Sequence, residues 1–454
     1  MKIIIIGAGE VGFHIASRLC AEDKNVVVID KSIQSLQRVN EQLDVQTING
    51  SGSNPSVLEE AGLREAEILL AVTDSDEINL VACLVADLIS PATKKLARIR
   101  EAAWDRYHEQ FQSNPPHIDS IINPEIEVVK TIEKLLFVPG AVDVGEFEEG
   151  RLKFVAIILD ESARLSGVRL EDMSTVLGSP HPLITALVRD DDLIIPSGKD
   201  RLMPRDLVYF ITTDASLIDT LKMFDKREED LKRVLIVGGG RIGYRLAKQL
   251  EEKSIQTKII ERNQERCSIL AEHLNKAVVL CADGSDQNIL TAENIQDMNA
   301  VVTVTDDEET NILVSMLSKQ KGVSKAITKV DRFSYFNLMS TIGIHRIVSP
   351  RLSAINSILQ HIRKGKILSD ITLKGEQAEV IEAVALETSE IVGKPLKSIS
   401  FPKEALLAGI ITEKEVIIPS GDSVVNPGDR IIIFAKRQAV PKIEKFLTVK
   451  LEFF

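Results

Sequence analysis

The stretch IIIIGAGEVG at residues 3–12 decides the fold, because it joins an apolar run to a G-x-G-x-x-G turn. A second apolar run, VVVID, follows and ends in Asp30. A strand, a glycine-rich turn that opens a helix, and an acid at the tip of the next strand together make the dinucleotide-binding fingerprint of a βαβ unit. The start of the chain therefore predicts a Rossmann-like domain.

The same pattern occurs a second time. Residues 234–243 read VLIVGGGRIG, and Glu261 follows. The shift between copies is 238 − 7 = 231 for the first glycine and 261 − 30 = 231 for the acid. Farther along, VTDSDEIN at 72–79 matches VTDDEETN at 304–311 with a shift of 232. Such constant spacing indicates a duplicated domain instead of two chance motifs.

Composition limits what the chain can be. With 454 residues, 44% of them hydrophobic, it is long enough for two to four domains, each burying a core of its own. The net charge is −12 and the short basic runs are isolated, so nucleic acid is not an expected partner. Four scattered cysteines without a C-x-x-C pair favour a reducing compartment, the cytosol, and argue against structural zinc.

No targeting or membrane segment is expected either. Met1-Lys2 leads directly into a strand, which is unlike a signal peptide. No stretch approaches the roughly 20 apolar residues that a spanning helix needs. We therefore expect any membrane association to depend on a partner protein.

The predicted fold class is α/β, with two Rossmann-like parallel-sheet domains that are each followed by a small α+β module. Short β-branched runs alternate with helical stretches in the larger segments. The smaller segments share the motif IIPSG, at 194–198 and 417–421. The expected boundaries are 1–123 for the first Rossmann-like domain, 124–140 for a connector helix, 141–225 for the first module, 232–349 for the second Rossmann-like domain, 350–366 for its connector helix, and 368–454 for the second module.

The glycine turns predict phosphate binding. Gly7 allows a sharp turn out of the strand, Gly9 allows backbone N–H groups to approach a pyrophosphate, and Gly12 allows close packing of helix on strand. Asp30 and Glu261 can accept hydrogen bonds from the ribose hydroxyls of an adenosine. Because a carboxylate there repels a 2′-phosphate, the sequence favours NAD over NADP.

Polar residues at other strand ends are further candidates. Thr73-Asp74 and Thr305-Asp306 should line the crevice over the carboxyl edge of each sheet. Each aspartate could instead be only a helix cap. Arg98 could meet a phosphate, or form a surface ion pair. Lys329 holds the matching place, since 329 − 98 = 231.

The sequence offers no catalytic set and no metal-ligand spacing. The histidines are isolated from nucleophiles and from one another. Tyr244-x-x-x-Lys248 matches the Tyr/Lys pair of short-chain dehydrogenases, but it falls inside the helix that follows the second glycine turn. We therefore expect no enzymatic activity.

Together, the IIIIGAGEVG start, Asp30, VTDSDEINLVA, the second VGGGRIG with IERNQERC, and the two IIPSG modules resemble the TrkA-type regulatory subunits of Trk potassium-uptake systems. The resemblance covers essentially the whole chain. It implies two RCK (regulator of potassium conductance) units, each a nucleotide domain followed by a small module. It also implies a cytosolic homo-oligomer, dimer or tetramer, that docks on a membrane-spanning potassium-transporting subunit and gates it by binding NAD(H) or ATP/ADP.

The residues expected to contact nucleotide come from both copies. The second site departs from the first, because Arg241 stands where the first copy has Glu10 and Lys329 where it has Arg98, so its ligand or affinity can differ. The candidates are Gly7, Ala8, Gly9, Glu10, Val11, Gly12, Asp30, Thr73, Asp74 and Arg98 in the first copy, and Gly238, Gly239, Gly240, Arg241, Ile242, Gly243, Glu261, Thr305 and Asp306 in the second.

Two alternatives stay open at this point. One is a nucleotide-dependent regulator of another cation transporter, such as a cation/proton antiporter, because RCK-type domains accompany other membrane proteins too. The other is a tandem NAD-dependent oxidoreductase, which the small modules and the missing proton donors disfavour.

Overall fold

The computed structural model of the chain describes residues 1–178, 181–190, 192–227, 230–362, 367–373, 377–413 and 415–447. These residues fall into two compact units. The first contains Met1–Val128 together with the helix that begins at Pro350. The second contains the described residues from Val129 to Ser349 and those after residue 366.

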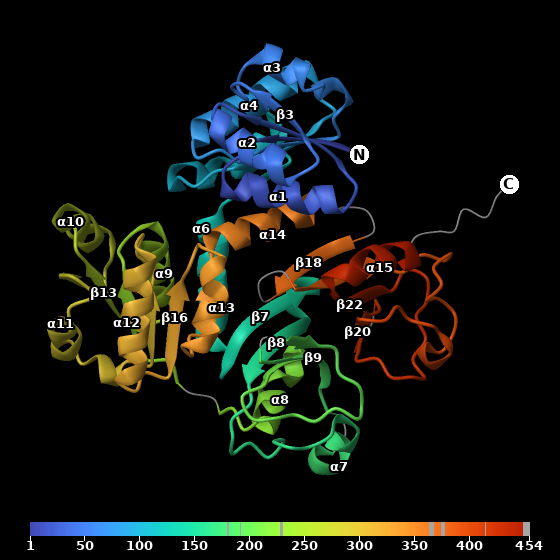
Figure 1. The fold of residues 1–454 in the computed structure, drawn as a ribbon. Coiled ribbons are helices and arrows are strands. Elements are labelled where there is room, and N and C mark those ends of the chain that lie inside the picture. The colour runs from blue at the N-terminus through green and yellow to red at the C-terminus, as the bar shows by residue number, and fades with distance from the viewer. Residues whose placement is uncertain are drawn as a thin grey trace. The chain divides into compact units, whose positions relative to one another are not determined.

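The first unit is built on a six-stranded parallel sheet with the order β3-β2-β1-β4-β5-β6 (Figure 1). The order reverses between β1 and β4, which makes the carboxyl ends of these strands the switch point where ligands bind in such folds. The central strand is buried on both faces, as its unbroken isoleucine run predicts. Its strands are β1 Lys2–Ile6, β2 Asn25–Asp30, β3 Gln46–Asn49, β4 Ile68–Ala71, β5 Lys94–Arg98 and β6 Ser120–Ile122, and its helices are α1 Glu10–Ala21, α2 Ile33–Gln42, α3 Pro55–Glu60, α4 Asp76–Ile89 and α5 His108–Ser113.

The helix of the second connector, α14 (Pro350–Ile362), also belongs to this unit and packs on α1 (Figure 1). Ile355, Ile358 and Leu359 are buried there. Its last turn is tied to the sheet by a hydrogen bond of 2.7 Å between Ser120 Oγ and His361 Nε2. The helix begins at Pro350 as predicted, and residues 363–366 of the expected connector lie outside the described part of the chain.

The second unit contains a sheet of the same kind, with the order β14-β13-β12-β15-β16-β17 and all pairings parallel. The first connector helix, α6 (Pro124–Phe137), ends against it. Lys325 Nζ donates to the carbonyl of Leu136 at 3.0 Å, and the Lys253 ammonium lies 4.6 Å from the centre of the Phe137 ring. The elements are β12 Arg233–Val237, β13 Gln256–Glu261, β14 Val278–Cys281, β15 Ala300–Thr303, β16 Lys325–Lys329 and β17 Arg346–Val348, with α9 Arg241–Glu252, α10 Gln264–His273, α11 Gln287–Ala292, α12 Glu308–Gln320 and α13 Ser334–Thr341.

The two C-terminal modules also lie in the second unit, and each is a five-stranded antiparallel sheet. The orders are β10-β9-β11-β8-β7 and β18-β19-β22-β20-β21. The strands are β7 Ala141–Phe147, β8 Leu152–Ile158, β9 Leu183–Arg189, β10 Asp192–Ile194, β11 Leu207–Thr213, β18 Ile367–Leu373, β19 Ala378–Val384, β20 Ala405–Ile411, β21 Val416–Ile417 and β22 Arg430–Lys436, and the helices are α7 Met173–Leu177, α8 Leu217–Met223 and α15 Val440–Leu447.

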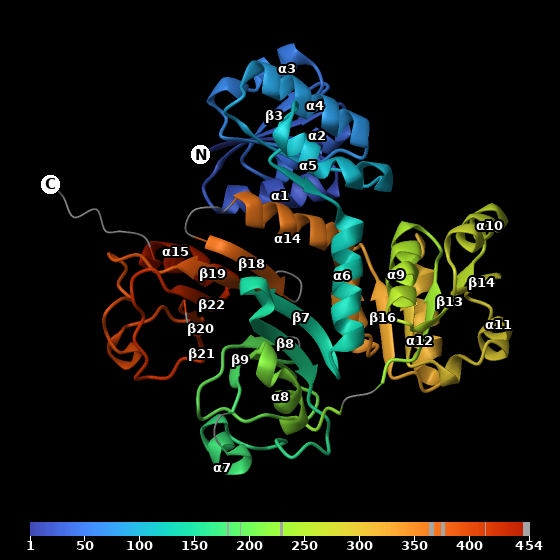
Figure 2. The ribbon, with the colours of Figure 1, turned by 180° about the vertical axis from the view of Figure 1, so that it is seen from behind.

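These two sheets share one hydrophobic core (Figure 2). Phe154 of β8 and Phe434 of β22 stack with their ring centres 6.0 Å apart, and Tyr209 of β11 also stacks on Phe154, at 5.3 Å. The second module also buries a core of its own, between its sheet and α15, so the shared core lies beside it. Each sheet has two apolar faces, and one face of each is covered by the other module.

No helix in the described ranges has both the length and the apolar character that crossing a bilayer requires.

Candidate nucleotide sites

The three glycines of the first turn have different structural roles. Gly7 has φ +109°, a conformation that other residues avoid, and its N–H donates to the carbonyl of Ile29 at 2.8 Å. A Cβ at Gly12 would lie 1.8 Å from the carbonyl oxygen of Gly7, so α1 can approach the strand only without a side chain there. A Cβ at Gly9 would meet no atom within 4 Å. The fold itself therefore explains Gly7 and Gly12 but not Gly9.

The second turn reproduces this geometry. Gly238 has φ +111°, and a Cβ at Gly243 would lie 2.0 Å from its carbonyl oxygen. A Cβ at Gly240, the counterpart of Gly9, again meets nothing within 4 Å. The open space beside the middle glycine, at the N-terminus of a helix, fits the close approach of a pyrophosphate in both copies.

Both strand-end acids are held by backbone N–H groups. Asp30 accepts from Ala8 at 2.6 Å on one oxygen and from Ser32 at 2.7 Å on the other. Glu261 accepts from Gly239 and from Asn263, both at 2.8 Å. Since each carboxylate oxygen has a second lone pair, both acids can still accept a ribose hydroxyl. Each acid is therefore fixed beside its glycine turn, in an orientation that suits an adenosine ribose.

A buried asparagine organises each pair of strand tips, a role that the sequence analysis did not assign. Asn79, fully buried, accepts from the N–H and hydroxyl of Thr73 at 3.0 and 2.7 Å and donates to the carbonyls of Thr73 and Arg98. Asn311 makes the same four contacts with Thr305 and Lys329. The signal was present in the repeat, because both asparagines follow their threonine by six residues.

The cations at the ends of β5 and β16 pair with the aspartates that follow β4 and β15. Arg98, largely buried, donates to the exposed Asp74 at 3.2 Å, and burial lowers the pKa of its guanidinium. Lys329 likewise lies 3.3 Å from the exposed Asp306. The interpretation of Asp74 as a helix cap is wrong, because Ser75 caps α4 by accepting from the N–H of Ile78.

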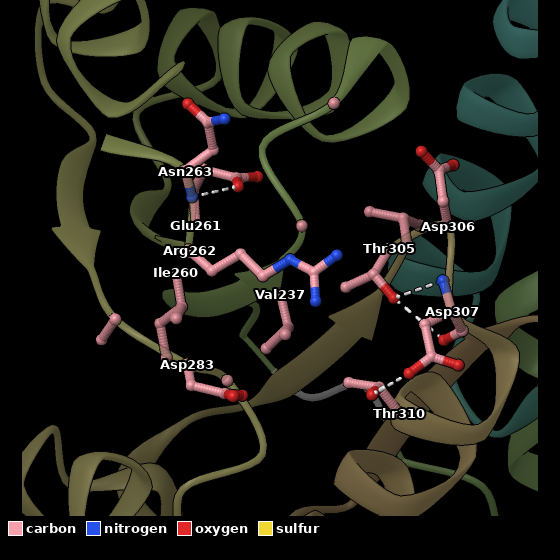
Figure 3. A pocket seen from close by; sticks show the side chains of 15 residues that line it. Val237, Ile260, Glu261, Arg262, Asn263, Asp283, Thr305, Asp306, Asp307 and Thr310 are labelled. Atoms are coloured by element: carbon pink, nitrogen blue, oxygen red, sulfur yellow. Dashed lines mark hydrogen bonds between the residues drawn. The ribbon is translucent and has the colours of Figure 1, made fainter. Parts of the chain in front are cut away.

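The second copy opens into a cavity of about 290 Å³, close to the lower end of the range for ligand pockets (Figure 3). Glu261 lies on one side and Thr305 on the other, and the Arg262 side chain extends between them (Figure 3). Sequence reasoning expected the polar tip at 282–286, which includes Asp283, to line the crevice, but it missed Arg262, although this residue adjoins a predicted strand end. The cavity is lined by Val237, Gly238, Gly240, Ile260, Glu261, Arg262, Asn263, Ala282, Asp283, Gly284, Val304, Thr305, Asp306, Asp307 and Thr310.

The two turns differ in charge at the first helical residue. In the first copy Glu10 is bonded to Arg38, and this contact lowers the pKa of the Glu10 carboxyl, so it is ionised at neutral pH. Arg241 occupies the equivalent position in the second copy. Its positive charge adds to the helix dipole there, whereas Glu10 opposes it. The two turns therefore differ in the sign of the charge at the residue that begins the helix.

The Tyr244 and Lys248 pair lies on α9, as predicted. The Tyr244 ring meets His273 edge-on at 6.4 Å and lies under the Arg266 guanidinium at 5.9 Å, and neither Tyr244 nor Lys248 lines the cavity. Within the described ranges, no three His, Cys, Asp or Glu side chains come together as a metal site would require.

Comparison with known proteins follows the two-copy organisation. The TrkA-N domain family matches residues 3–124 and 234–350, and the TrkA-C domain family matches residues 380–448. The Trk system potassium uptake protein TrkA homolog 1 of Methanosarcina mazei is 37% identical over 98% of this chain and 100% of its own length. The TrkA protein of Halomonas elongata is 36% identical over 100% of both chains.

Solved structures with the same fold include the GsuK RCK domain, with a TM-score of 0.60 at 17% identity over 98% of this chain and 94% of that one. The GsuK channel bound to NAD also aligns with a TM-score of 0.60, at 16% identity over 98% of this chain and 78% of that one. These likenesses support the duplicated RCK fold. With two TrkA-N segments, a TrkA-C segment and full-length relatives above 30% identity, the chain belongs to the TrkA family of Trk system potassium uptake proteins.

Proposed function

We propose that this chain is the cytosolic regulatory subunit of a Trk-type potassium-uptake system and that it binds NAD(H), or an adenine nucleotide such as ATP or ADP, at both glycine turns. One observation carries the proposal: in both copies an open middle glycine lies beside a carboxylate held by backbone N–H groups. The names of the relatives supply potassium uptake, and the GsuK channel bound to NAD supplies a ligand.

A ligand can control a partner only by binding one conformation more tightly than another. The connector helices offer a route for this, because each packs on the nucleotide domain of one copy and leads into the module of the other. In the first unit α1 begins at the glycine turn and packs against α14, which leads to the second module. In the second unit α9 begins at its glycine turn, and Lys253 at its end contacts Glu133 and Phe137 of α6, which leads to the first module. A movement of either turn would thus reach the module attached to the other copy.

Exposed apolar side chains support the expected self-assembly into a homo-oligomer. Val81, Leu84 and Leu88 project from α4, and Leu313 and Met316 project from the equivalent helix α12. Apolar side chains grouped on an exposed helix face favour association. We propose that the assembly docks on the cytoplasmic side of a membrane-spanning potassium-transporting subunit, through which it is peripheral to the membrane.

Calorimetric titration of the purified full-length protein with NADH, NAD⁺ and ATP tests the proposal. We expect two sites per chain, with different preferences among the three ligands. Replacing Asp30 or Glu261 with alanine should weaken one site each, by about 1.5–3 kcal/mol, because a charge-assisted ribose contact is lost. Tyr244→Phe keeps the ring packing and should bind like the parent. Absence of binding to all three ligands would overturn the proposal.

A tandem dehydrogenase would behave differently in the same protein. It would turn over NADH steadily with a suitable substrate, and Tyr244→Phe would reduce the rate. Copurification with a potassium-transporting subunit, compared with copurification with a cation/proton antiporter, separates the proposed function from its nearest alternative.

A further inference from the structure

Two cysteines that are 14 residues apart converge beside the second nucleotide site. Cys267 is buried in the first turns of α10, and Cys281 is exposed at the end of β14. The Cys267 thiol donates to the carbonyl of Glu261 at 3.3 Å, and the N–H of Ala282, next to Cys281, donates to the same oxygen at 3.0 Å. Cys281 is also the direct partner of Glu261 in the pairing of β13 with β14. The Cys267 thiol and the backbone of Cys281 therefore both lie at the Glu261 peptide group.

Burial, followed by a hydrogen bond with the Cys281 thiol, raises the pKa of Cys267 to about 11. Cys267 is therefore a protonated thiol at neutral pH, while Cys281 is the one that solvent reaches. The pair thus combines an accessible thiol, which peroxide can oxidise first, with a sheltered neighbour whose sulfur can attack the oxidised one.

The first copy has no such pair. The residues at the matching shifts are Leu36, since 267 − 231 = 36, and Asn49, since 281 − 232 = 49. The Asn49 side-chain amide donates to the carbonyls of Asp30 and Lys31, so in the first copy this position holds the end of β2, which carries Asp30, by hydrogen bonds. In the second copy the corresponding place is taken by a group that oxidants can change.

We infer that Cys267 and Cys281 form a redox-modifiable dithiol whose oxidation to a disulfide weakens nucleotide binding at the second site. The binding part of the inference rests on the proposed function. With a peroxide as oxidant, the Cys281 thiolate attacks a peroxide oxygen and becomes a sulfenic acid. The Cys267 sulfur then attacks the Cys281 sulfur and displaces water, so that two thiols and one H₂O₂ give one disulfide and two H₂O.

The coupling to the site follows from the neighbours of Cys267. Its thiol loses the hydrogen that now bonds the Glu261 carbonyl, and its sulfur must move to about 2.05 Å from that of Cys281. The preceding residue, Arg266, donates from Nε to the carbonyl of Gly239 at 2.7 Å in the glycine turn. A shift of the first turns of α10 therefore displaces both the acid strand and the turn that should hold the pyrophosphate.

The test uses full-length protein with Asp30→Ala, which weakens the first site so that binding at low NADH concentration reports on the second. After treatment with hydrogen peroxide, trypsin should release residues 267–276 and 277–319 as one linked species, because Arg266, Lys276 and Lys319 bound the two peptides. We expect NADH affinity to fall by about 3- to 10-fold, the effect of losing a hydrogen bond of ordinary strength, and to recover with dithiothreitol.

Cys281→Ser in the same background should be insensitive to peroxide, and Cys20→Ser should respond like its parent. A missing linked species, or a linked protein with unchanged NADH affinity, overturns the inference and leaves the proposed function intact. Reduced protein that binds no nucleotide overturns the proposed function and the coupling with it, while the linked peptides still support the dithiol itself.

Discussion

The middle glycine of each turn provides a sharp test of ligand binding. Gly9 has φ −67° and ψ −175°, and Gly240 has φ −62° and ψ −165°, which are extended conformations open to any residue. A methyl group at either position meets no protein atom within 4 Å. Replacing either glycine with alanine should therefore leave the folded state unstrained and, by restricting the unfolded chain, stabilise it by up to about 1 kcal/mol.

The same methyl group would occupy the space through which a pyrophosphate approaches the backbone N–H groups. Loss of one charge-assisted hydrogen bond costs about 1.5–3 kcal/mol, which corresponds to about a 10- to 150-fold increase in Kd. In calorimetric titrations with NADH, Gly9→Ala should weaken the first site and Gly240→Ala the second by this amount. Thermal melting of each variant should match or slightly exceed that of the parent.

Gly12→Ala is the contrasting control. Its Cβ would lie 1.8 Å from the carbonyl oxygen of Gly7, so this variant should melt at a lower temperature whether or not a nucleotide is present. If Gly9→Ala and Gly240→Ala fold normally and retain NADH affinity within about twofold, the open space is not a ligand site and the reasoning fails.

Two further predictions follow from the charges in the structure. Glu10→Arg should strengthen ATP binding at the first site, and Arg241→Glu should weaken it at the second, by about 0.3–1 kcal/mol each. Titrations at two ionic strengths should show smaller effects of both variants at high salt. Desolvation raises the pKa of Asp143 in the first module from 3.8 to about 6, with Tyr209 and Lys134 as its charged or titratable neighbours. Below about pH 4 the Asp143 carboxyl is protonated in the folded and the unfolded chain, and the folded state loses stability as the pH rises through about 6, where the buried carboxyl must ionise. Asp143→Asn should therefore melt higher than the parent at pH 7 and equally at pH 4. A parent and variant that differ equally at both pH values would contradict this.

The sequence predicted the parallel sheets because those depend on local signals. Gly7 and Gly238 are needed for a backbone conformation that other residues avoid, and Asp30 and Glu261 end strands of constant spacing. The connectors were predicted as helices from a proline at their first turn.

What the sequence did not predict depends on which surfaces meet. The apolar face of α14 shows that it packs on something, but nothing in its residues identifies α1 as the partner. The pattern of β8 and β22 likewise indicates buried faces without indicating that they cover each other. Asn79, Arg262 and the Cys267–Cys281 pair act through contacts across strands or across a cavity, so their roles appear only once the chain is folded.

The position of α14 in the chain also determines when the first domain can be completed during synthesis, because α14 covers α1 but is made much later. The last strand of the first sheet ends at Ile122, but the helix that covers α1 begins only at Pro350, 350 − 122 = 228 residues later. At ordinary translation rates this delay is on the order of 10–50 s. During that time the nascent first domain presents an uncovered apolar face, which a neighbouring nascent chain could occupy with its own α14. Because α14 belongs to the same chain, this face is covered within one molecule once synthesis has passed residue 362.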